Sequence, residues 1–152
     1  MSALHWTCEH FDELTTASLY QLMRLRSEVF VVEQRCVYLD PDGLDDRVWH
    51  LCGRTDDGAL HAYARLLPPS LGEGAARIGR VITAPAARGG GLGRTLMQQA
   101  LAACGRLWPS SAIELGAQAH LRDFYGSFGF TPISEVYDED GIPHIDMRRE
   151  ST

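Results

Sequence analysis

The chain has 152 residues with 45% hydrophobic and 22% charged side chains, so we expect one ordered domain over residues 1–152 with an ordinary apolar core. The net charge of −6 argues against nucleic acids and anionic membrane surfaces as partners. All 14 basic residues are arginine, which excludes a lysine Schiff base, a pyridoxal-phosphate anchor and a Walker-type phosphate loop.

The first half of the chain predicts the order β-α-β-β. Apolar residues recur at helical spacing on the face that the helix is expected to bury, and one arginine, Arg26, falls on the same face. The following loop contains Asp, Pro and Gly and shows no periodicity. The expected elements are a strand at 4–8, a helix from Thr15 or Thr16 to Val32, a loop at 38–46, and hairpin strands at 48–54 and 59–67.

The second half predicts four strands and two helices, and the strand at 112–118 is expected to be buried. Gly105 stands where a helix end favours a left-handed residue. The expected elements are strands at 76–83, 112–118, 131–137 and 142–148, and helices at 92–104 and 120–128. The complete order, β-α-β-β-β-α-β-α-β-β, favours an α/β fold of the α+β kind, with a central mixed sheet flanked by helices.

A glycine-rich turn between a strand and an amphipathic helix carries the strongest functional signal. It reads Arg88-Gly-Gly-Gly-Leu-Gly-Arg-Thr95 and lies in a stretch, residues 74–113, that contains five arginines and no acid. Glycines allow successive N–H groups to converge, and a helix N-terminus adds its dipole and its unpaired donors. We therefore expect a diphosphate cradle, to which Arg88 or Arg94 adds bidentate charge. A dinucleotide fingerprint is excluded because Arg94 occupies its last glycine position.

Two blocks resemble the GNAT superfamily of N-acetyltransferases. Arg88, Gly91 and Gly93 match its acetyl-CoA signature, and Phe124-Tyr-Gly-Ser-Phe-Gly-Phe130 is similar to the block that closes its last helix. The run from Leu25 to Cys36 further resembles the ElaA branch of that superfamily. The resemblance implies the GNAT fold and acetyl-CoA as cosubstrate.

The resemblance also implies roles for individual residues. Tyr125 is expected to protonate the departing thiolate, and main-chain N–H groups around Val81 and Thr83 to bind the oxyanion. Gln118 replaces an asparagine common in the family, which alters a contact to the pantetheine arm. The expected cofactor-binding residues are Val81, Ile82, Thr83, Arg88, Gly89, Gly90, Gly91, Leu92, Gly93, Arg94, Thr95 and Gln118.

The general base is less well defined by the sequence. Glu33 is the first choice because apolar Val31 and Val32 precede it and the acidic loop follows. The other candidates are Glu114, His120 and His144. The acidic loop has two interpretations of equal weight, a site that holds a cationic amine or a solvated turn. Its acids are Asp40, Asp42, Asp45 and Asp46.

The predicted function is transfer of an acetyl group from acetyl-CoA to a primary amine of a small molecule or peptide. The alternatives are a CoA-binding sensor or interaction module without catalysis, and an enzyme that uses a longer acyl-CoA. No metal is expected, because His5, Cys8 and His10 lack a second ligand pair for zinc and residues 40–45 lack calcium-loop spacing. A homodimer would suit this fold. Without a signal peptide or a membrane-length segment, a cytoplasmic location is expected.

Overall fold

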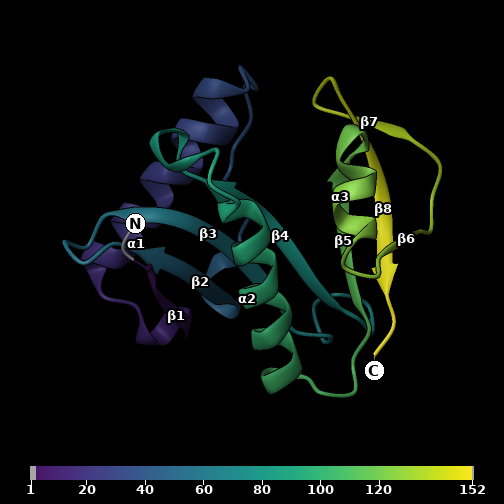
Figure 1. The fold of residues 1–152 in the computed structure, drawn as a ribbon, viewed down its shortest axis with the longest axis horizontal. Helices are drawn as coiled ribbons and strands as arrows, with labels where there is room; N and C mark the ends of the chain where they lie inside the picture. The colour runs from purple at the N-terminus through teal and green to yellow at the C-terminus, as the bar shows by residue number, and fades with distance from the viewer. Residues whose placement is uncertain (1–2, 152) are drawn as a thin grey trace.

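The computed structural model describes residues 3–151, which include one sheet of eight strands in the order β1-β2-β3-β4-β5-β8-β6, with β7 also paired to β8 (Figure 1). The strands are β1 His5–His10, β2 Trp49–Arg54, β3 Leu60–Leu67, β4 Ala76–Thr83, β5 Ile113–Gln118, β6 Thr131–Pro132, β7 Tyr137–Glu139 and β8 Ile142–Arg149. The helices are α1 Thr16–Arg26, α2 Leu92–Leu107 and α3 Arg122–Gly126. Shorter turns are π-helical at Ser27–Glu33 and 3₁₀ at Phe11–Glu13, Asp45–Arg47, Pro85–Ala87 and Ala119–Leu121.

The expected mixed sheet is confirmed, and helices cover both of its faces. β4 and β5 are parallel, whereas the other strand pairs are antiparallel. α1 packs Leu22 and Leu25 against Tyr63 of β3 in one apolar cluster. α2 and α3 share a second cluster, to which they contribute Met97 and Tyr125.

The first helix changes its winding partway along. The Thr15 hydroxyl accepts a hydrogen bond from the Ser18 N–H at 3.0 Å and caps α1 as predicted. After Arg26 the backbone continues as a π-helix to Glu33, so the expected extent of the helix, to about Val32, is confirmed, but its last part is π-helical. Such wide turns are rare and occur often at functional sites.

β4 contains a bulge. Tyr63 pairs with Ile82 whereas Arg65 pairs with Gly79, so β4 has one residue more than β3 over the same length. Arg80 lies in this bulge with a φ of 50°, a left-handed conformation that few residues other than glycine adopt. The bulge bends β4 away from a regular ladder.

The two central strands separate toward their carboxyl ends. β5 pairs with β4 at two positions, Ala76 with Ile113 and Arg77 with Glu114. Beyond Arg77, this edge of β4 has no strand partner within residues 3–151, although β4 continues to Thr83 (Figure 1). Open parallel strands bind ligands at such a point of divergence.

Two expectations near the ends of elements are wrong. α2 continues past Gly105 to Leu107, because Gly105 keeps a helical conformation and Trp108 ends the helix. The expected strand at 131–137 is divided into β6 and β7. Pro132 has no N–H for the ladder, and the Ser134 hydroxyl accepts the hydrogen bond of the Asp146 N–H at 2.9 Å, after which the chain leaves the sheet until Tyr137.

Candidate active site

A cavity of about 910 Å³ lies where β4 and β5 separate. The wall on the α1 side comes from the π-helical turn and the segment that follows it, and the opposite wall comes from β5, β7 and β8. The expected site residues that line this cavity are Glu33, Val81, Ile82, Thr83, Arg88, Gln118 and Tyr125. Seven residues that are widely spaced in the sequence thus meet in one space.

The remaining residues of the expected cradle, 89–95, form the turn after Arg88 and the first turn of α2 rather than the cavity wall. Gly89 and Gly91 have φ values of 98° and 76°, and a Cβ atom on either would meet no atom within 4 Å. Gly91 is the N-cap of α2 and offers no side-chain cap, so the N–H groups of the first helical turn stay available. This geometry fits a diphosphate.

The two arginines of the cradle are engaged with protein groups. Arg88 donates to both carboxylate oxygens of Glu33, at 2.8 and 2.9 Å. The guanidinium of Arg94 lies over the rings of Phe124 and Phe128, with its central carbon 5.7 and 4.9 Å from the ring centres. The expectation that either arginine is free to supply bidentate charge is therefore not met in this conformation.

Glu33 is consequently a poorer proton acceptor than its sequence context indicated. The hydrogen bonds from Arg88 lower the pKa of its carboxyl group below the usual range of glutamate. The carboxylate is 40% exposed and both of its oxygens lie in the guanidinium fork. To accept a proton from an amine, Glu33 would first have to leave Arg88.

Tyr125, the expected proton donor, lies in the wall of the cavity. It comes from α3, lines the cavity and is 7% exposed. Burial raises the pKa of its phenol to about 12, because the apolar surroundings disfavour the phenolate. The hydroxyl therefore keeps its proton at neutral pH, in the protonated form that a proton donor requires.

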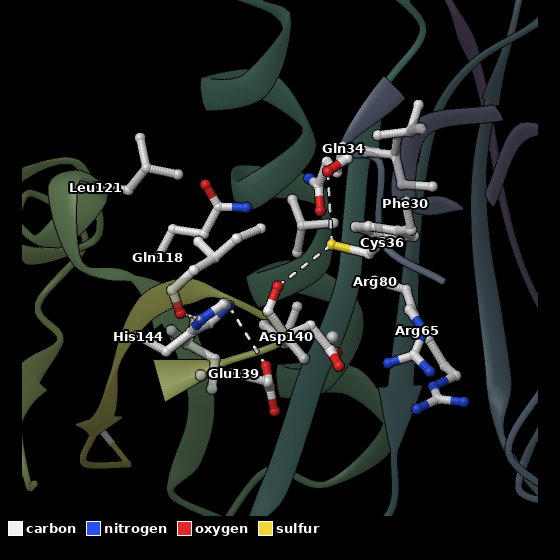
Figure 2. A pocket seen from close by; sticks show the side chains of 18 of the residues that line it. Phe30, Gln34, Cys36, Arg65, Arg80, Gln118, Leu121, Glu139, Asp140 and His144 are labelled. Carbon is white, nitrogen blue, oxygen red and sulfur yellow. Dashed lines mark hydrogen bonds and ion pairs between the residues drawn. The ribbon is translucent and has the colours of Figure 1, made fainter. Parts of the chain in front are cut away.

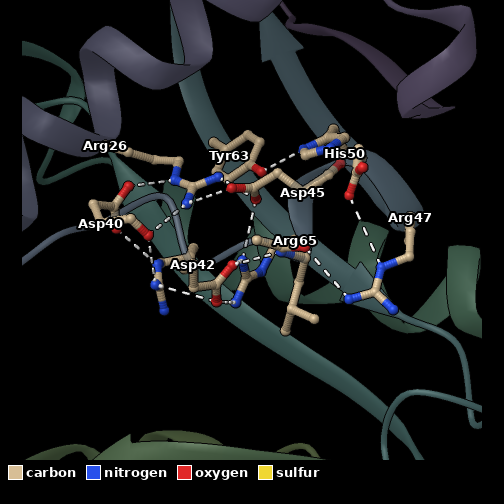
Figure 3. Close-up of polar contacts among 12 residues, drawn as sticks. Arg26, Asp40, Asp42, Asp45, Arg47, His50, Tyr63 and Arg65 are labelled. Carbon is tan, nitrogen blue, oxygen red and sulfur yellow. Dashed lines mark hydrogen bonds and ion pairs between the residues drawn. The ribbon is translucent and has the colours of Figure 1, made fainter.

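The acidic loop at 38–46 matches neither expected interpretation (Figure 3). Asp40 accepts hydrogen bonds from Arg26 at 2.7 Å and from Arg80 at 2.8 Å. Asp45 accepts from Arg26 at 2.7 Å and from Arg65 at 3.1 Å. These carboxylates are mostly buried and bound to arginines, so they are neither a solvated turn nor free to hold a cationic amine.

Asp42 completes this charge cluster, which consists of Arg26, Arg65, Arg80, Asp40, Asp42 and Asp45. Arg65 donates to both oxygens of Asp42 at 2.8 Å, and these contacts lower the pKa of Asp42 to about 2 against the opposing effect of burial. Three positive and three negative groups balance, so the cluster is formally neutral. Of the acids in the loop, Asp46 remains largely exposed, 3.9 Å from Arg47.

A buried histidine, His50, lies beside the charge cluster, next to Asp45 and Tyr63 (Figure 3). His50 is fully buried, with Nε2 2.9 Å from the Asp45 carbonyl oxygen and Nδ1 2.6 Å from the Tyr63 hydroxyl. Since a carbonyl only accepts, Nε2 carries the hydrogen and the Tyr63 hydroxyl donates to Nδ1. Burial lowers the pKa of His50, so the neutral ring is the stable form.

The opposite wall of the cavity is a short hairpin (Figure 2). β7 and β8 are joined by Asp140 and Gly141, whose φ values of 52° and 82° define the type I′ turn expected for Asp-Gly. The Cys36 thiol lies 3.6 Å from the Asp140 carbonyl oxygen and so connects the two walls across the cavity mouth. His144 of β8 points into the cavity between Gln118 and Glu139.

The other base candidates differ in position. Glu114 does not line the cavity but binds Arg148 at 2.7 Å and lies 3.6 Å from Arg77, so it is committed to ion pairs on the outer part of β5. His120 and His144 both line the cavity. Of these two, His144 has contacts on both ring nitrogens, 2.8 Å from Nδ1 to the Ile142 carbonyl oxygen and 3.4 Å from Nε2 to Glu139.

Sequence reasoning missed the charge cluster and the role of the hairpin. Helical spacing does place Arg26 on the buried face of α1, and an arginine there signals a buried acidic partner. No pattern indicates which acid meets it. Within residues 3–151, we find no group of three or more His, Cys, Asp or Glu side chains that could hold a metal ion. In the same range, no helix has the length and apolar character needed to cross a membrane.

Comparison with known proteins identifies the family. Residues 47–151 match the model described as "Acetyltransferase (GNAT) domain". ElaA of Escherichia coli is 49% identical over 150 residues, 97% of each chain, and its crystal structure superposes with a TM-score of 0.91 over 97% of this chain and 99% of that one, at 48% identity. An acyl-CoA N-acyltransferase structure from Pseudomonas aeruginosa gives a TM-score of 0.94 at 53% identity, with 97% and 99% of the two chains covered. The chain therefore belongs to the GNAT acetyltransferase family, in which ElaA is a close relative.

Proposed function

We propose that the chain transfers an acetyl group from acetyl-CoA to a primary amine of a small molecule or peptide, by direct attack of the amine on the thioester. Membership of the GNAT family supports an acyl-CoA-dependent transferase. The observation that carries the finer proposal is the position of Tyr125, whose protonated and buried hydroxyl lines the same cavity as the unpaired edge of β4.

Three parts of the protein have separate roles in this reaction. The glycine turn and the N-terminus of α2 bind the diphosphate. The free edge of β4, around Val81 and Thr83, offers main-chain N–H groups to the pantetheine arm and to the oxyanion that forms on the thioester carbonyl. When the carbon–sulfur bond breaks, the Tyr125 hydroxyl protonates the thiolate.

The test is an assay of free CoA thiol with acetyl-CoA and a panel of alkylamines, polyamines, amino-acid amides and short peptides. We expect thiol release with at least one primary amine. Tyr125→Phe should lower kcat about 100-fold, the usual contribution of an acid catalyst, while calorimetry shows unchanged CoA affinity. Tyr20→Phe is the matched control, because it makes the same change at an exposed position of α1.

Three outcomes would contradict the proposal. Normal turnover in Tyr125→Phe would remove this residue as the acid. CoA binding without thiol release across the panel would support a binding module instead of an enzyme. Turnover with a longer acyl-CoA but not with acetyl-CoA would replace acetyl by a longer acyl group.

A further inference from the structure

We propose that His144 is the general base that accepts the proton of the attacking amine, an inference that rests on the proposed N-acetyltransferase function. Three observations carry it: the position of the ring in the sheet, the hydrogen bond that fixes its tautomer, and the carboxylate beside its second nitrogen.

The ring occupies the end of the sheet that borders the cavity. His144 of β8 lies directly opposite Gln118 of β5 on one side and Tyr137 of β7 on the other. Directly opposed residues of antiparallel strands place their side chains on the same face, and all three line the cavity. Figure 2 shows the imidazole between Gln118 and Glu139, facing the inner space. His144 thus lies beside the carboxyl end of β5, beyond the stretch in which β5 pairs with β4.

The tautomer of the ring follows from its contacts. Nδ1 lies 2.8 Å from the Ile142 carbonyl oxygen, which can only accept, so Nδ1 carries the hydrogen. In the neutral ring Nε2 then presents its lone pair. This nitrogen is 3.4 Å from a carboxylate oxygen of Glu139, so two acceptors face each other until Nε2 takes up a proton. When the amine proton moves to Nε2, the Glu139 carboxylate lies within ion-pair distance of the nitrogen that receives it.

The competing bases are less suited by their contacts. Both oxygens of Glu33 are bound by Arg88, and Glu114 lies outside the cavity in an ion pair with Arg148. His120 lines the cavity but is exposed, and no contact to either of its ring nitrogens is seen within residues 3–151. His144 alone among the candidates that line the cavity combines a fixed tautomer with a neighbouring carboxylate.

The proposed step conserves atoms and charge. The amine nitrogen forms a bond to the thioester carbonyl carbon, and the carbon–sulfur bond of the tetrahedral intermediate breaks. The amine proton passes to Nε2 of His144, and the sulfur receives the proton of the Tyr125 hydroxyl. Solvent returns the proton from His144 to Tyr125, so the products are the amide and CoA thiol, and no other reactant is needed.

A pH profile must take the neighbouring ionisable groups into account. Those that line the cavity around the imidazole are Glu139, Tyr137, Asp140, Cys36 and His120, and Asp146 of β8 binds the Tyr137 hydroxyl. Of these groups, Glu139 is the one in ion-pair contact with the ring, at 3.4 Å from Nε2. Replacement of Glu139 therefore tests the role of His144 while the imidazole stays in place.

The decisive experiment measures kcat with acetyl-CoA and the most active amine of the panel, from about pH 5 to pH 8, where histidine titrates. In the unmodified protein we expect kcat to fall on the acid side. His144→Gln should lower kcat at neutral pH about 100-fold or more and abolish that fall. CoA affinity should not change. The matched control is His5→Gln, because His5 is exposed on β1 and pairs with Asp56 outside the cavity.

Two further measurements keep the proposal testable if His144→Gln folds poorly. Glu139→Gln should also lower kcat, because the imidazolium that forms during the step loses its neighbouring carboxylate. Nitrogen-15 spectra of the unmodified protein should show hydrogen on Nδ1 of His144 and not on Nε2 at neutral pH.

The outcomes separate this inference from the proposed function. Wild-type kcat and an unchanged acid limb in His144→Gln would overturn His144 as the base while leaving the acetyltransferase function intact. If Glu33→Gln or His120→Gln showed the loss of kcat expected for His144→Gln, that result would also overturn His144 as the base and would identify the residue that serves instead. Absence of thiol release from the unmodified protein with every amine would overturn the proposed function, and this inference with it.

Discussion

The two sides of the cavity are held in shape by different kinds of interaction. On the β4–α2 side the shape comes from the backbone, through the bulge at Arg80 in the wall and the left-handed glycines 89 and 91 in the turn beside it. On the side formed by residues 26–46 it comes from side chains, namely the three arginines and three aspartates of the charge cluster. The first side is therefore sensitive to the addition of a Cβ atom, and the second to the removal of a charge.

The largest expected effect is on the charge cluster. Arg26→Met keeps the length of the side chain but leaves Asp40 and Asp45 buried without their main partner. Breaking a buried ion pair on one side costs about 3–5 kcal/mol, because the remaining charge is uncompensated. Urea unfolding at neutral pH measures this loss.

Arg47→Met is the matched control, since Arg47 is exposed and lies 3.9 Å from Asp46. It should change the free energy of unfolding by less than about 1 kcal/mol. Equal losses in both variants would show that the charge cluster has no special role in the α1 side of the cavity.

A smaller effect is expected from pH. Asp42 and Asp45 have pKa values below the usual aspartate range, so the stability they confer is present above about pH 3.9 and is lost as the pH falls toward about 2. His50 also has a lowered pKa. Below about pH 6.5 this histidine is protonated in the unfolded chain but stays neutral in the folded protein, which favours unfolding. The free energy of unfolding should therefore decrease in two stages on acidification.

Urea unfolding over a pH series checks this prediction. His50→Gln should remove the upper stage, which begins near about pH 6.5 as the pH falls, and leave the lower stage unchanged. Persistence of the upper stage in that variant would assign it to another group.

The smallest effect on stability is expected on the backbone side. Gly91→Ala forces a Cβ atom onto a φ of 76° and should cost about 1 kcal/mol. The added methyl group also points into the open space where the diphosphate is expected, so CoA affinity measured by calorimetry should fall.

Gly105→Ala is the control within the same helix. Gly105 has helical geometry and an open position, so alanine there should raise stability by about 0.5–1 kcal/mol and leave CoA affinity unchanged. If both variants bind CoA as the unmodified protein does, the glycine turn does not hold the diphosphate.

The same contrast explains how much was predictable from the sequence. Strands, α2 and the glycine turn depend on patterns within about ten residues, which periodicity and turn chemistry capture. Arg26 and Asp40 are 14 residues apart and Arg80 and Asp40 are 40 apart, and nothing local indicates those pairings. The acidic loop therefore resembled a solvated turn although its carboxylates are buried.

The ranking of the base candidates depends on tertiary contacts in the same way. Glu33 was favoured by its neighbours in the sequence, but its properties depend on Arg88, 55 residues away. His144 gains its properties from Glu139 and the Ile142 carbonyl, contacts that exist only once the Asp-Gly turn has folded the hairpin. The sequence identified the candidates, and the tertiary contacts rank them.

The two residue pairs that join β4 to β5 also make the molecule mechanically uneven. β1 to β4 form one continuous antiparallel ladder, and β5 to β8 form another. A load pulling these halves apart is carried by the pairs Ala76–Ile113 and Arg77–Glu114 and by the apolar core beneath α2. We expect the boundary between β4 and β5 to open first under force, and this boundary is also the proposed binding site of acetyl-CoA. A molecule bound there would hold the two halves of the sheet together.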